Sequence, residues 1–508
     1  MAMTLRTAAV LARGGFVDLF NTSVGMPEAG VPTMAGFVPQ AAFARASGVL
    51  KESFRQSDPP ISIPVVATHR IHSLAVAAKL VEAGVCDLVG LARPLLADAG
   101  FIAKAQRGEV DRIIPCIACN HCVNRLYKHQ RVGCAVNPIS GWELERGNEG
   151  VGEGSDGVEA GKPGEENQTT NGQTRKELVV MRRKAIAVVG AGAAGVSCAL
   201  TLARRGHDVT LFERAPVIGG QLHLAKQVPG KAAYNDILVY WTKELQKSTI
   251  NVRLETEFTR EEVARNHNFF HAIVLANGSI PRPITSHVFP GASESGIVVP
   301  FSKILDGSVR AGRRVAILGN GAISHDVASF LLHDPRVARR VELFLHEWGV
   351  NLEEGTILPP DHARDRAPRN NRDVILFNKP DKDADLSWGT GWAQKLWIRN
   401  HGGTILNHAL IEMIDPHGIH ISTLPPDNRK FYVECDTIVW CNGMLPNFSV
   451  GTWIYEWMKD GARKRGEMIG DFSIYSAGSC RDSYTGDGHG EQDLMQAVHE
   501  GYEIGSKI

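Results

Sequence analysis

Residues 184–195, with the sequence KAIAVVGAGAAG, decide the fold of this chain. The apolar run predicts a buried strand, and the glycines that follow predict a tight turn that opens a helix. Gly190, Gly192 and Gly195 have the spacing of a dinucleotide-binding turn, in which the backbone approaches a pyrophosphate at the N-terminus of a helix. We therefore expect a Rossmann-like unit to begin here.

The residues after this turn strengthen the prediction. Glu213 ends the next apolar run, DVTLFER, eighteen positions after Gly195, where a carboxylate can accept hydrogen bonds from an adenosine ribose. Gly219, Gly220 and Gln221 form a further glycine turn, which suits the close approach of a flavin diphosphate. The strand, the helix and the acid together favour nucleotide binding over an ordinary glycine-rich turn.

A second glycine turn follows about 130 residues later, in RRVAILGNGAIS. Gly319 and Gly321 keep the first two glycines, and Ser324 replaces the third, so we expect slightly looser packing between this helix and its strand. The turn is compatible with a diffusible nicotinamide cofactor, and an ordinary structural turn stays open as the alternative.

The run VELFLHE, residues 341–347, is interpreted as the strand that follows this second turn. Glu347 at its end could then contact a ribose hydroxyl of the nicotinamide cofactor. Arg339 and Arg340 lie nearby, and a guanidinium group can accommodate a 2′-phosphate. The sequence therefore leaves both NADH and NADPH open.

Four of the nine cysteines, Cys116, Cys119, Cys122 and Cys134, crowd into nineteen positions. Four thiolates suit either tetrahedral zinc or a cubane iron–sulfur cluster. Structural zinc usually takes two ligands from each of two paired motifs, whereas three close cysteines and one distant cysteine favour a [4Fe-4S] cluster. The residues expected to shield the cluster or to balance its charge are Ile117, Ala118, Val136, Arg125 and Lys128.

Composition excludes several classes of partner. The chain has 508 residues with 55 basic and 55 acidic side chains, so its formal net charge is zero and favours neither nucleic acid nor a membrane surface. No stretch approaches the roughly eighteen apolar residues of a membrane span, and the first residues lack the features of a leader peptide. We expect a cytoplasmic protein that acts on a small-molecule substrate.

Strand and helix patterns alternate from the N-terminus to the cysteines. They predict an α/β fold that begins with three βα units of a partial (β/α)8 TIM barrel and continues with FAD- and NAD(P)-binding Rossmann-like domains. Three units leave strand edges exposed, so we expect a homo-oligomer or a second chain that completes the barrel. The expected parts are a partial barrel (1–112), a Cys-rich iron–sulfur segment (113–140), a disordered linker (141–183), an FAD-binding domain (184–300 and 430–508) and an NAD(P)-binding domain (301–429).

These pieces in this order resemble the 2,4-dienoyl-CoA reductase and trimethylamine dehydrogenase group of old yellow enzyme relatives. The resemblance covers nearly the whole chain and rests on the motifs NTSVGMPEAGVPT, PVVATHRI, GLARPLLAD, CIACNHC with its distal GCAVNP, VVGAGAAG, IGGQL with QVPGK, VLANGSIPRP, HEWGVN, GTGW and WCNGMLPN. It implies a barrel that holds FMN, a cluster that passes electrons to it from FAD, and NADPH that reduces the FAD.

The resemblance also implies roles for single residues. Arg70 and Arg93 fall where the last barrel strands of the family hold the FMN phosphate, and surface arginines are the alternative. The residues expected to bind FAD are Gly190, Gly192, Gly195, Glu213, Arg214, Gly220, Gln221, Gly278 and Gly478.

Three departures from the family pattern concern the barrel and the flavin sites. The chain begins where the family is already about five strands into its barrel, which indicates either a short barrel or a truncated gene model. Pro27 stands at the position of the family's active-site histidine and cannot donate a proton, so no catalytic residue is assigned. Cys480 replaces an acid near the end of the FAD domain, where we still expect FAD to bind through Gly478.

The leading functional hypothesis is a reductase that uses NAD(P)H, FAD and a [4Fe-4S] cluster to reduce an activated C=C bond of the enone or dienoyl type, with FMN as a further cofactor if it binds. The first alternative is an FAD and iron–sulfur enzyme or electron-transfer protein that lacks FMN chemistry. The second is a partner-dependent oxidoreductase, or a remnant of one, because the barrel portion is incomplete.

Overall fold

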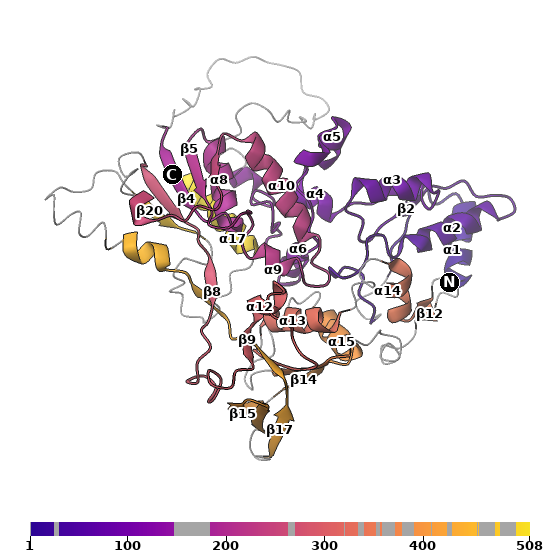
Figure 1. Cartoon of the computed structure of the whole chain (residues 1–508). Coiled ribbons are helices and arrows are strands. Elements are labelled where there is room, and N and C mark those ends of the chain that lie inside the picture. Colours follow the sequence, from indigo (N-terminus) through magenta and orange to yellow (C-terminus); the bar gives the residue numbers. More distant parts are fainter. Residues whose placement is uncertain are drawn as a thin grey trace, which may run out of the picture.

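The computed structural model describes residues 2–24, 30–146, 183–262, 270–319, 321–333, 340–351, 356–357, 371–377, 391–407, 409–423, 429–454, 456, 473–477 and 494–508. Two five-stranded parallel sheets form separate layers, and a small three-stranded sheet lies near the N-terminus (Figure 1). Pro27, Arg339, Gly478 and Cys480 lie outside the described residues.

The first five-stranded sheet grows from the opening motif. All five residues of β4 (Ala185–Val189) are buried, as expected for the central strand of a parallel sheet. The strand order is β20-β7-β4-β5-β6, and β4 pairs in parallel with β5 and β7. The other strands are β5 (Asp208–Phe212), β6 (Asn251–Arg253), β7 (Ala272–Leu275) and β20 (Ser473–Ser476).

Helices cover this sheet. Two of them, from distant parts of the sequence, pack against each other. Helix α8 (Ala193–Arg204) follows the first glycine turn, and the last helix of the chain, α17 (Leu494–Lys507), packs along it. A β-carbon on Gly501 would lie 2.1 Å from the carbonyl oxygen of Ala194, so only glycine permits this close approach. The other helices around this sheet are α9 (Leu222–Ala225) and α10 (Tyr234–Lys247).

The second five-stranded sheet has the order β14-β13-β10-β18-β9 and is also parallel. Its strands are β9 (Val298–Pro300), β10 (Arg314–Leu318), β13 (Asp373–Phe377), β14 (Thr404–Leu406) and β18 (Thr437–Trp440). Its helices are α12 (Phe301–Leu305), α13 (Ala322–Leu332), α14 (Val341–Glu347) and α15 (Gly391–Asn400). An antiparallel sheet of β15 (Ala409–Asp415), β16 (Gly418–Thr423) and β17 (Lys430–Glu434) extends from it (Figure 1).

Two findings revise the sequence interpretation of this part. Strands β9 and β18 pair within the second sheet, although the expected boundaries at residues 300 and 430 assign both to the FAD-binding domain. The chain passes between the sheets at β8 (Ser279–Pro281) and β19 (Met444–Pro446), which pair with each other.

The expected strand at residues 341–347 is wrong, because these residues form helix α14. Their buried positions, Phe344 and Glu347, are three residues apart, which is helical spacing. The strand that follows the second glycine turn and pairs beside β10 is β13. Two short strands, β11 (Val350–Asn351) and β12 (Thr356–Ile357), pair after α14.

The N-terminal segment contains the three βα units that the sequence indicates. Strands β1 (Phe20–Asn21), β2 (Val65–Ala67) and β3 (Leu88–Val89) form a parallel sheet in that order. The helices of this segment are α1 (Ala2–Arg13), α2 (Ala44–Arg55), α3 (Leu74–Glu82), α4 (Arg93–Ala97) and α5 (Phe101–Gln106), followed by the 3-10 turn η2 (Val110–Arg112).

The Cys-rich segment connects the N-terminal sheet to the first large sheet. It contains α6 (His121–Tyr127), and residues 141–146 of the expected linker include the short helix α7 (Glu143–Arg146). Arg146 forms an ion pair with Glu503 of α17, so this part of the linker is folded against the first large domain. The rest of the expected linker, residues 147–182, lies outside the described residues. Among the described helices, none has the length and apolarity that a membrane span requires.

Candidate functional site

The first glycine turn has the geometry that the sequence predicts. Gly190 has a φ of +102°, and a β-carbon on Gly195 would lie 1.8 Å from the carbonyl oxygen of Gly190. Both positions therefore require glycine. A β-carbon on Gly192 would meet no atom within 4 Å, so this glycine faces open space at the N-terminus of α8. The turn thus combines tight packing with an open backbone surface, as a bound pyrophosphate needs.

The two glycine turns of the first domain converge. A β-carbon on Gly220, whose φ is +51°, would lie 3.4 Å from the Cα of Gly192. Both turns lie at the carboxyl end of β4. This strand lies between β5 and β7, where the strand order reverses. Ligands of open parallel sheets bind at such a point. The residues present therefore fit an FAD diphosphate.

Glu213 lies directly after β5, where the sequence analysis expects a ribose-binding acid. Its Oε2 atom accepts a hydrogen bond from the backbone N–H of Ala191 at 2.8 Å, and its Oε1 atom accepts one from Ala215 at 2.9 Å. The carboxylate is thus held against the glycine turn, and each of its oxygens keeps acceptor capacity for a ligand hydroxyl.

The remaining residues expected to bind FAD lie at different places. Gln221 donates hydrogen bonds to the carbonyl and the hydroxyl of Ser279 in β8, at 3.2 and 3.0 Å. Gly278 has a φ of +73° and forms the turn before β8. Arg214 is exposed beside Glu213, and Gly478 lies outside the described residues.

The second glycine turn is as tight as the first. Gly319 has a φ of +147°, and a β-carbon there would lie 2.3 Å from the carbonyl oxygen of Cys441 in the neighbouring strand segment. Ser324 is fully buried and donates a hydrogen bond to the carbonyl of Gly321 at 2.6 Å. The serine hydroxyl therefore ties the first turn of α13 to its N-cap residue, and the looser packing expected at Ser324 stays a prediction.

Glu347 does not lie at the position of a ribose-binding acid. It ends helix α14, is 3 % exposed, and faces His401 with an Oε1 to Nε2 distance of 3.4 Å. A ribose-binding residue would follow β13 instead, and residues 378–390 lie outside the described part of the chain. The choice between NADH and NADPH therefore stays open.

The four clustered cysteines surround one small cavity. Cys116, Cys119, Cys122 and Cys134 all line it, together with Arg93, Asn120 and apolar side chains. Within the described residues, no group of three or more His, Cys, Asp or Glu side chains forms a site for a single metal ion. The four thiols thus share one cavity.

Burial controls the protonation of these thiols. Burial raises the pKa of Cys119 above its ordinary range and the pKa of Cys134 to about 12, and the neighbouring thiols raise both further. Burial is also the largest cause of the raised pKa of Cys122. Thiolates in this cavity need a positive partner such as a metal centre, because ligation requires the deprotonated form.

The cysteine cavity adjoins the FAD-binding domain. Ile117 and Val136, which line the cavity, also belong to the apolar core around β4 and α8. His499 on α17 lies 3.0 Å through its Nε2 atom from the carbonyl oxygen of Cys134, and Trp142 packs edge-on against the same imidazole. The cysteine loop is therefore fixed to the helix that packs on the nucleotide-binding helix.

The two arginines expected to hold an FMN phosphate lie beside the cysteine loop. Arg93 lines the cysteine cavity and donates hydrogen bonds to the Oδ1 atom of Asn120 and the carbonyl of Met34. Arg70 is buried and donates to the carbonyls of Gly36 and Val38 at 2.9 and 2.8 Å.

Arg70 lies close to a second positive charge, that of Arg93. Burial and the positive charge of Arg93 lower the pKa of Arg70 to about 10, while Cys116 opposes the shift. The Nη1 atom of Arg70 is buried without a hydrogen-bond partner among the described residues. An anion placed here would find one free guanidinium donor, so the arrangement fits a phosphate in part.

Several contacts in this site are not visible in the sequence. His499 is separated from Cys134 by 365 positions, and no motif links them. Arg125, expected to balance the charge of a cluster, instead stacks on Trp142, and Arg93 takes the place beside the thiols. The family histidine position, Pro27, lies outside the described residues, so the structure assigns no proton donor there.

Comparisons with known proteins agree with this geometry. The family model described as "Pyridine nucleotide-disulphide oxidoreductase" matches residues 184–349. A metal reductase of Desulforamulus reducens is 31% identical over 319 residues, which are 62% of this chain and 42% of the relative. A cinnamate reductase of Clostridium sporogenes is 27% identical over 56% of this chain and 37% of its own length. The chain thus spans about two fifths of the length of these relatives.

One solved structure aligns with nearly the whole chain. A 2-naphthoyl-CoA reductase complex superposes with a TM-score of 0.73 at 23% sequence identity, covering 99% of this chain and 62% of that protein. At this identity the likeness concerns the fold. The sequence relatives and this fold are consistent with the resemblance to the group of 2,4-dienoyl-CoA reductase and trimethylamine dehydrogenase, and residues 184–349 match the pyridine nucleotide-disulphide oxidoreductase model.

Proposed function

We propose that this chain is an NAD(P)H-dependent flavin and iron–sulfur oxidoreductase. FAD would lie against the open backbone of Gly192 and Gly220, with Glu213 at its ribose, and NAD(P)H would lie against the turn of Gly319 and Gly321. Each turn precedes the N-terminus of a helix, α8 or α13, where backbone N–H groups would donate to a pyrophosphate. The match to the pyridine nucleotide-disulphide oxidoreductase model covers both turns.

The observation that carries the proposal is the cysteine cavity beside the flavin domain. We infer that Cys116, Cys119, Cys122 and Cys134 hold a [4Fe-4S] cluster, because the four thiols line one cavity and their spacing, three close cysteines and one distant cysteine, favours a cubane over zinc. Ile117 and Val136 exclude water from the cavity, and Arg93 supplies positive charge at its wall. Apolar shielding and nearby charge are among the features that set the potential of such a cluster.

The chain's own residues prepare these cofactors for electron transfer. When bound, FAD supplies a two-electron acceptor for a hydride and the cluster supplies single-electron steps. His499 and Trp142 hold the loop of Cys134 against α17, and α17 packs on α8, whose N-terminus faces the flavin diphosphate site. Cofactors in these two sites would share one continuous apolar core.

We propose an activated C=C bond, of the enone or dienoyl type, as the leading acceptor. The family resemblance and the relative named cinnamate reductase support this choice. In that case FMN would lie at the N-terminal sheet, and the unpaired Nη1 atom of Arg70 would donate to its phosphate. Another copy of the chain or a second chain would cover β1 and β3, each of which pairs on one side only in the described sheet.

A second candidate is an FAD and iron–sulfur oxidoreductase without FMN chemistry. The hydrogen bonds of Arg93 to Asn120 and of Arg70 to two backbone carbonyls favour it, because they engage both guanidinium groups within the chain itself. The arginines would then balance the charge of the cluster.

Anaerobic titration with NADH and NADPH tests the proposal. We expect bleaching of the flavin absorbance, followed by reduction of the iron–sulfur centre, with oxidation of the reduced protein by 2-cyclohexen-1-one as the probe enone. Bleaching without any reoxidation by the enone would favour the second candidate. Absence of flavin from the purified protein, or of any response to either nucleotide, would contradict both candidates.

A further inference from the structure

Both ring nitrogens of His499, on the last helix of the chain, have polar partners. The Nε2 atom lies 3.0 Å from the carbonyl oxygen of Cys134, and the Nδ1 atom lies 3.1 Å from the Nη1 atom of Arg146. The histidine is only 8 % exposed, so water competes little for either contact. The imidazole therefore bridges a proposed cluster ligand and a guanidinium group.

Arg146 determines which ring nitrogen of His499 carries the proton. A guanidinium group has donors and no acceptor, so its Nη1 atom donates and the Nδ1 atom of the imidazole accepts. An imidazole that accepts at Nδ1 carries its hydrogen on Nε2, and this N–H donates to the carbonyl oxygen of Cys134. The arginine thus acts on Cys134 through one oriented, neutral ring.

Further contacts hold Arg146 in this position. Its Nη1 atom also donates to the carbonyl of Pro138 at 2.6 Å, and its Nη2 atom donates to Oε1 of Glu503 at 2.6 Å. The hydroxyl of Tyr502 donates to the backbone carbonyl of Arg146 at 3.0 Å. Glu503 lies four residues after His499 on α17, which is helical spacing, so one face of the helix offers the guanidinium two partners.

An indole ring covers these contacts. Trp142 packs edge-on against His499 with the ring centroids 5.2 Å apart, and the guanidinium carbon of Arg146 lies 4.9 Å from the centroid of the same indole. A β-carbon on Gly133 would lie 2.4 Å from this indole, so the residue before Cys134 must be glycine for the ring to fit. The indole reduces the access of water, and hydrogen bonds are stronger where water is excluded.

The same part of α17 is bonded to the FAD-binding domain. The hydroxyl of Ser197 on α8 donates to the carbonyl of Val498 at 2.7 Å, and both residues are buried. His499 follows Val498 directly, so its ring is placed by a segment that α8 holds. The contact between the imidazole and Cys134 is therefore kept in one geometry.

We propose that Arg146 and His499 are positioning residues that raise the reduction potential of the cluster through Cys134. The inference rests on the proposed [4Fe-4S] cluster. An N–H group directed at a ligand residue turns the positive end of its dipole toward a centre that gains negative charge on reduction, so it stabilises the reduced form. The cysteine spacing gives no sign of this control, because 353 positions separate the arginine from the histidine.

Potentiometric titration of the anaerobic holoenzyme, followed by electron paramagnetic resonance, tests this role. In His499→Leu we expect the equilibrium constant for one-electron reduction of the cluster to fall about threefold, which corresponds to a potential about 28 mV lower. His499→Gln should restore the potential, because an amide can accept from Arg146 and donate to Cys134. The iron content per chain should be the same in both variants.

A double variant separates the hydrogen-bonded path from a direct effect of charge. Arg146→Met should lower the potential by about as much as His499→Leu, because the imidazole loses the donor that fixes its proton. In the double variant the two shifts should not add, since both changes break the same path. Full additivity would show that Arg146 acts by its charge alone and would overturn the inference.

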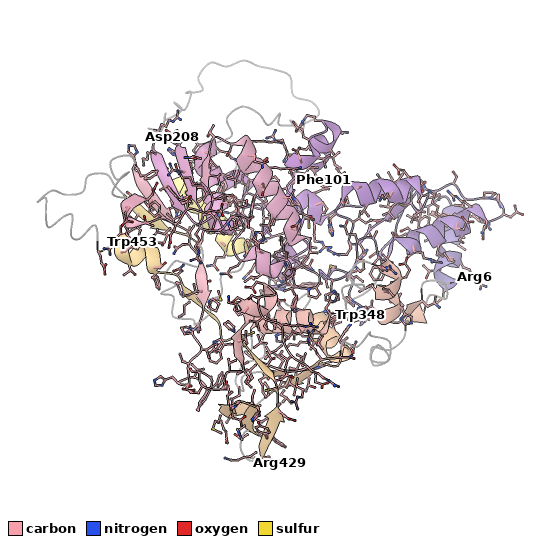
Figure 2. The ribbon with its side chains drawn as sticks, in the orientation of Figure 1. Arg6, Phe101, Asp208, Trp348, Arg429 and Trp453 are labelled. Atoms are coloured by element: carbon pink, nitrogen blue, oxygen red, sulfur yellow. The ribbon has the colours of Figure 1, made fainter. Side chains whose placement is uncertain are left out.

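His420→Leu is the matched control and should keep the original potential. His420 lies in the antiparallel sheet of β15 to β17, away from α17 (Figure 1), and Arg429 beside β17 marks this lower end of the molecule in Figure 2. Unchanged potentials in His499→Leu and Arg146→Met, with iron retained, overturn the inference and leave the proposed cluster standing. Original protein without iron overturns both. If His499→Leu loses its iron, the comparison of Arg146→Met with His499→Gln still decides.

Discussion

The first glycine turn of the FAD-binding domain and the arginine pair Arg70 and Arg93 of the N-terminal segment differ in how their charged groups are held. At the first glycine turn, both oxygens of Glu213 accept backbone hydrogen bonds, and the five residues of β4 are all buried. In the N-terminal segment the strands have two or three residues, and buried nitrogens of Arg70 and His72 have no partner among the described residues. The glycine turn holds its carboxylate with its own backbone, whereas the arginine pair of the N-terminal segment offers positive charge to a group from outside.

The electrostatics of the N-terminal segment support this contrast. Burial, Arg70 and Arg93 lower the pKa of His72 to about 3, so this imidazole stays neutral beside two guanidinium groups. Burial and the positive charge of Arg93 lower the pKa of Arg70, and a nearby anion or polarisable group would offset this repulsion. The cysteine cavity, which Arg93 lines, is one such place.

Loss of one cluster ligand should have the largest effect on the comparison. Cys134→Ser is expected to remove nearly all bound iron while FAD remains, because the flavin residues lie on other elements. Iron analysis and flavin absorbance measure both cofactors in one sample. Cys86→Ala, a buried cysteine of the N-terminal segment, is the control and should keep its iron. Equal iron in both variants would show that Cys134 is not a ligand.

The two glycines of the first turn separate folding from cofactor binding. Gly195→Ala places a β-carbon 1.8 Å from the carbonyl of Gly190, so we expect loss of the folded domain and of FAD. Gly192→Ala meets no atom within 4 Å, so the fold should survive while FAD affinity falls at least tenfold. Circular dichroism and flavin release report the two effects. Unchanged FAD affinity in Gly192→Ala would place the diphosphate elsewhere.

Arg70→Met tests the buried charge of the N-terminal segment. The carbonyls of Gly36 and Val38 lose their donor, so we expect the free energy of unfolding to fall by roughly 2–4 kcal/mol. Chemical denaturation measures this change, with Arg125→Met at a less buried site as the comparison. An increase in stability would instead mean that the repulsion between Arg70 and Arg93 outweighs these hydrogen bonds.

The pH dependence of stability tests the protonation of Glu347, the last residue of helix α14. Its folded-state pKa of about 8 lies above the ordinary value of 4.5, so the folded protein binds this proton more tightly than the unfolded chain. The contribution is fully present below about pH 4.5 and is lost as the pH rises toward 8, by at most about 1.4 kcal/mol per pH unit. Thermal melts between pH 6 and 8 should show a steeper decline for the original protein than for Glu347→Gln. Parallel declines would contradict the assignment.

The sequence predicts those parts of the fold that depend on local spacing. The first glycine turn is of this kind, because a β-carbon on Gly195 would meet the carbonyl of Gly190, only five residues earlier in the chain. The membership of β9 and β18 in the second sheet depends on pairing across more than 100 residues, and boundaries placed by composition miss it. The helix at 341–347 is misread because a short apolar run fits either period.

In the candidate site, too, some features follow from local spacing and others depend on distant parts of the chain. The spacing of the cysteines predicts that they gather, and the structure brings them to one cavity. The positions of His499 and Arg93 beside that cavity follow from how α17 and the N-terminal segment pack, which no local pattern encodes. Gly478 and Pro27 lie outside the described residues, and their roles stay predictions.

Metal and sulfide analysis of protein purified without oxygen, with an electron paramagnetic resonance spectrum after reduction, tests the central claim most directly. The account predicts about four iron atoms and four sulfides per chain and a signal of a reduced [4Fe-4S] cluster, together with one FAD. One zinc ion per chain without iron, or thiols that bind no metal, would contradict it.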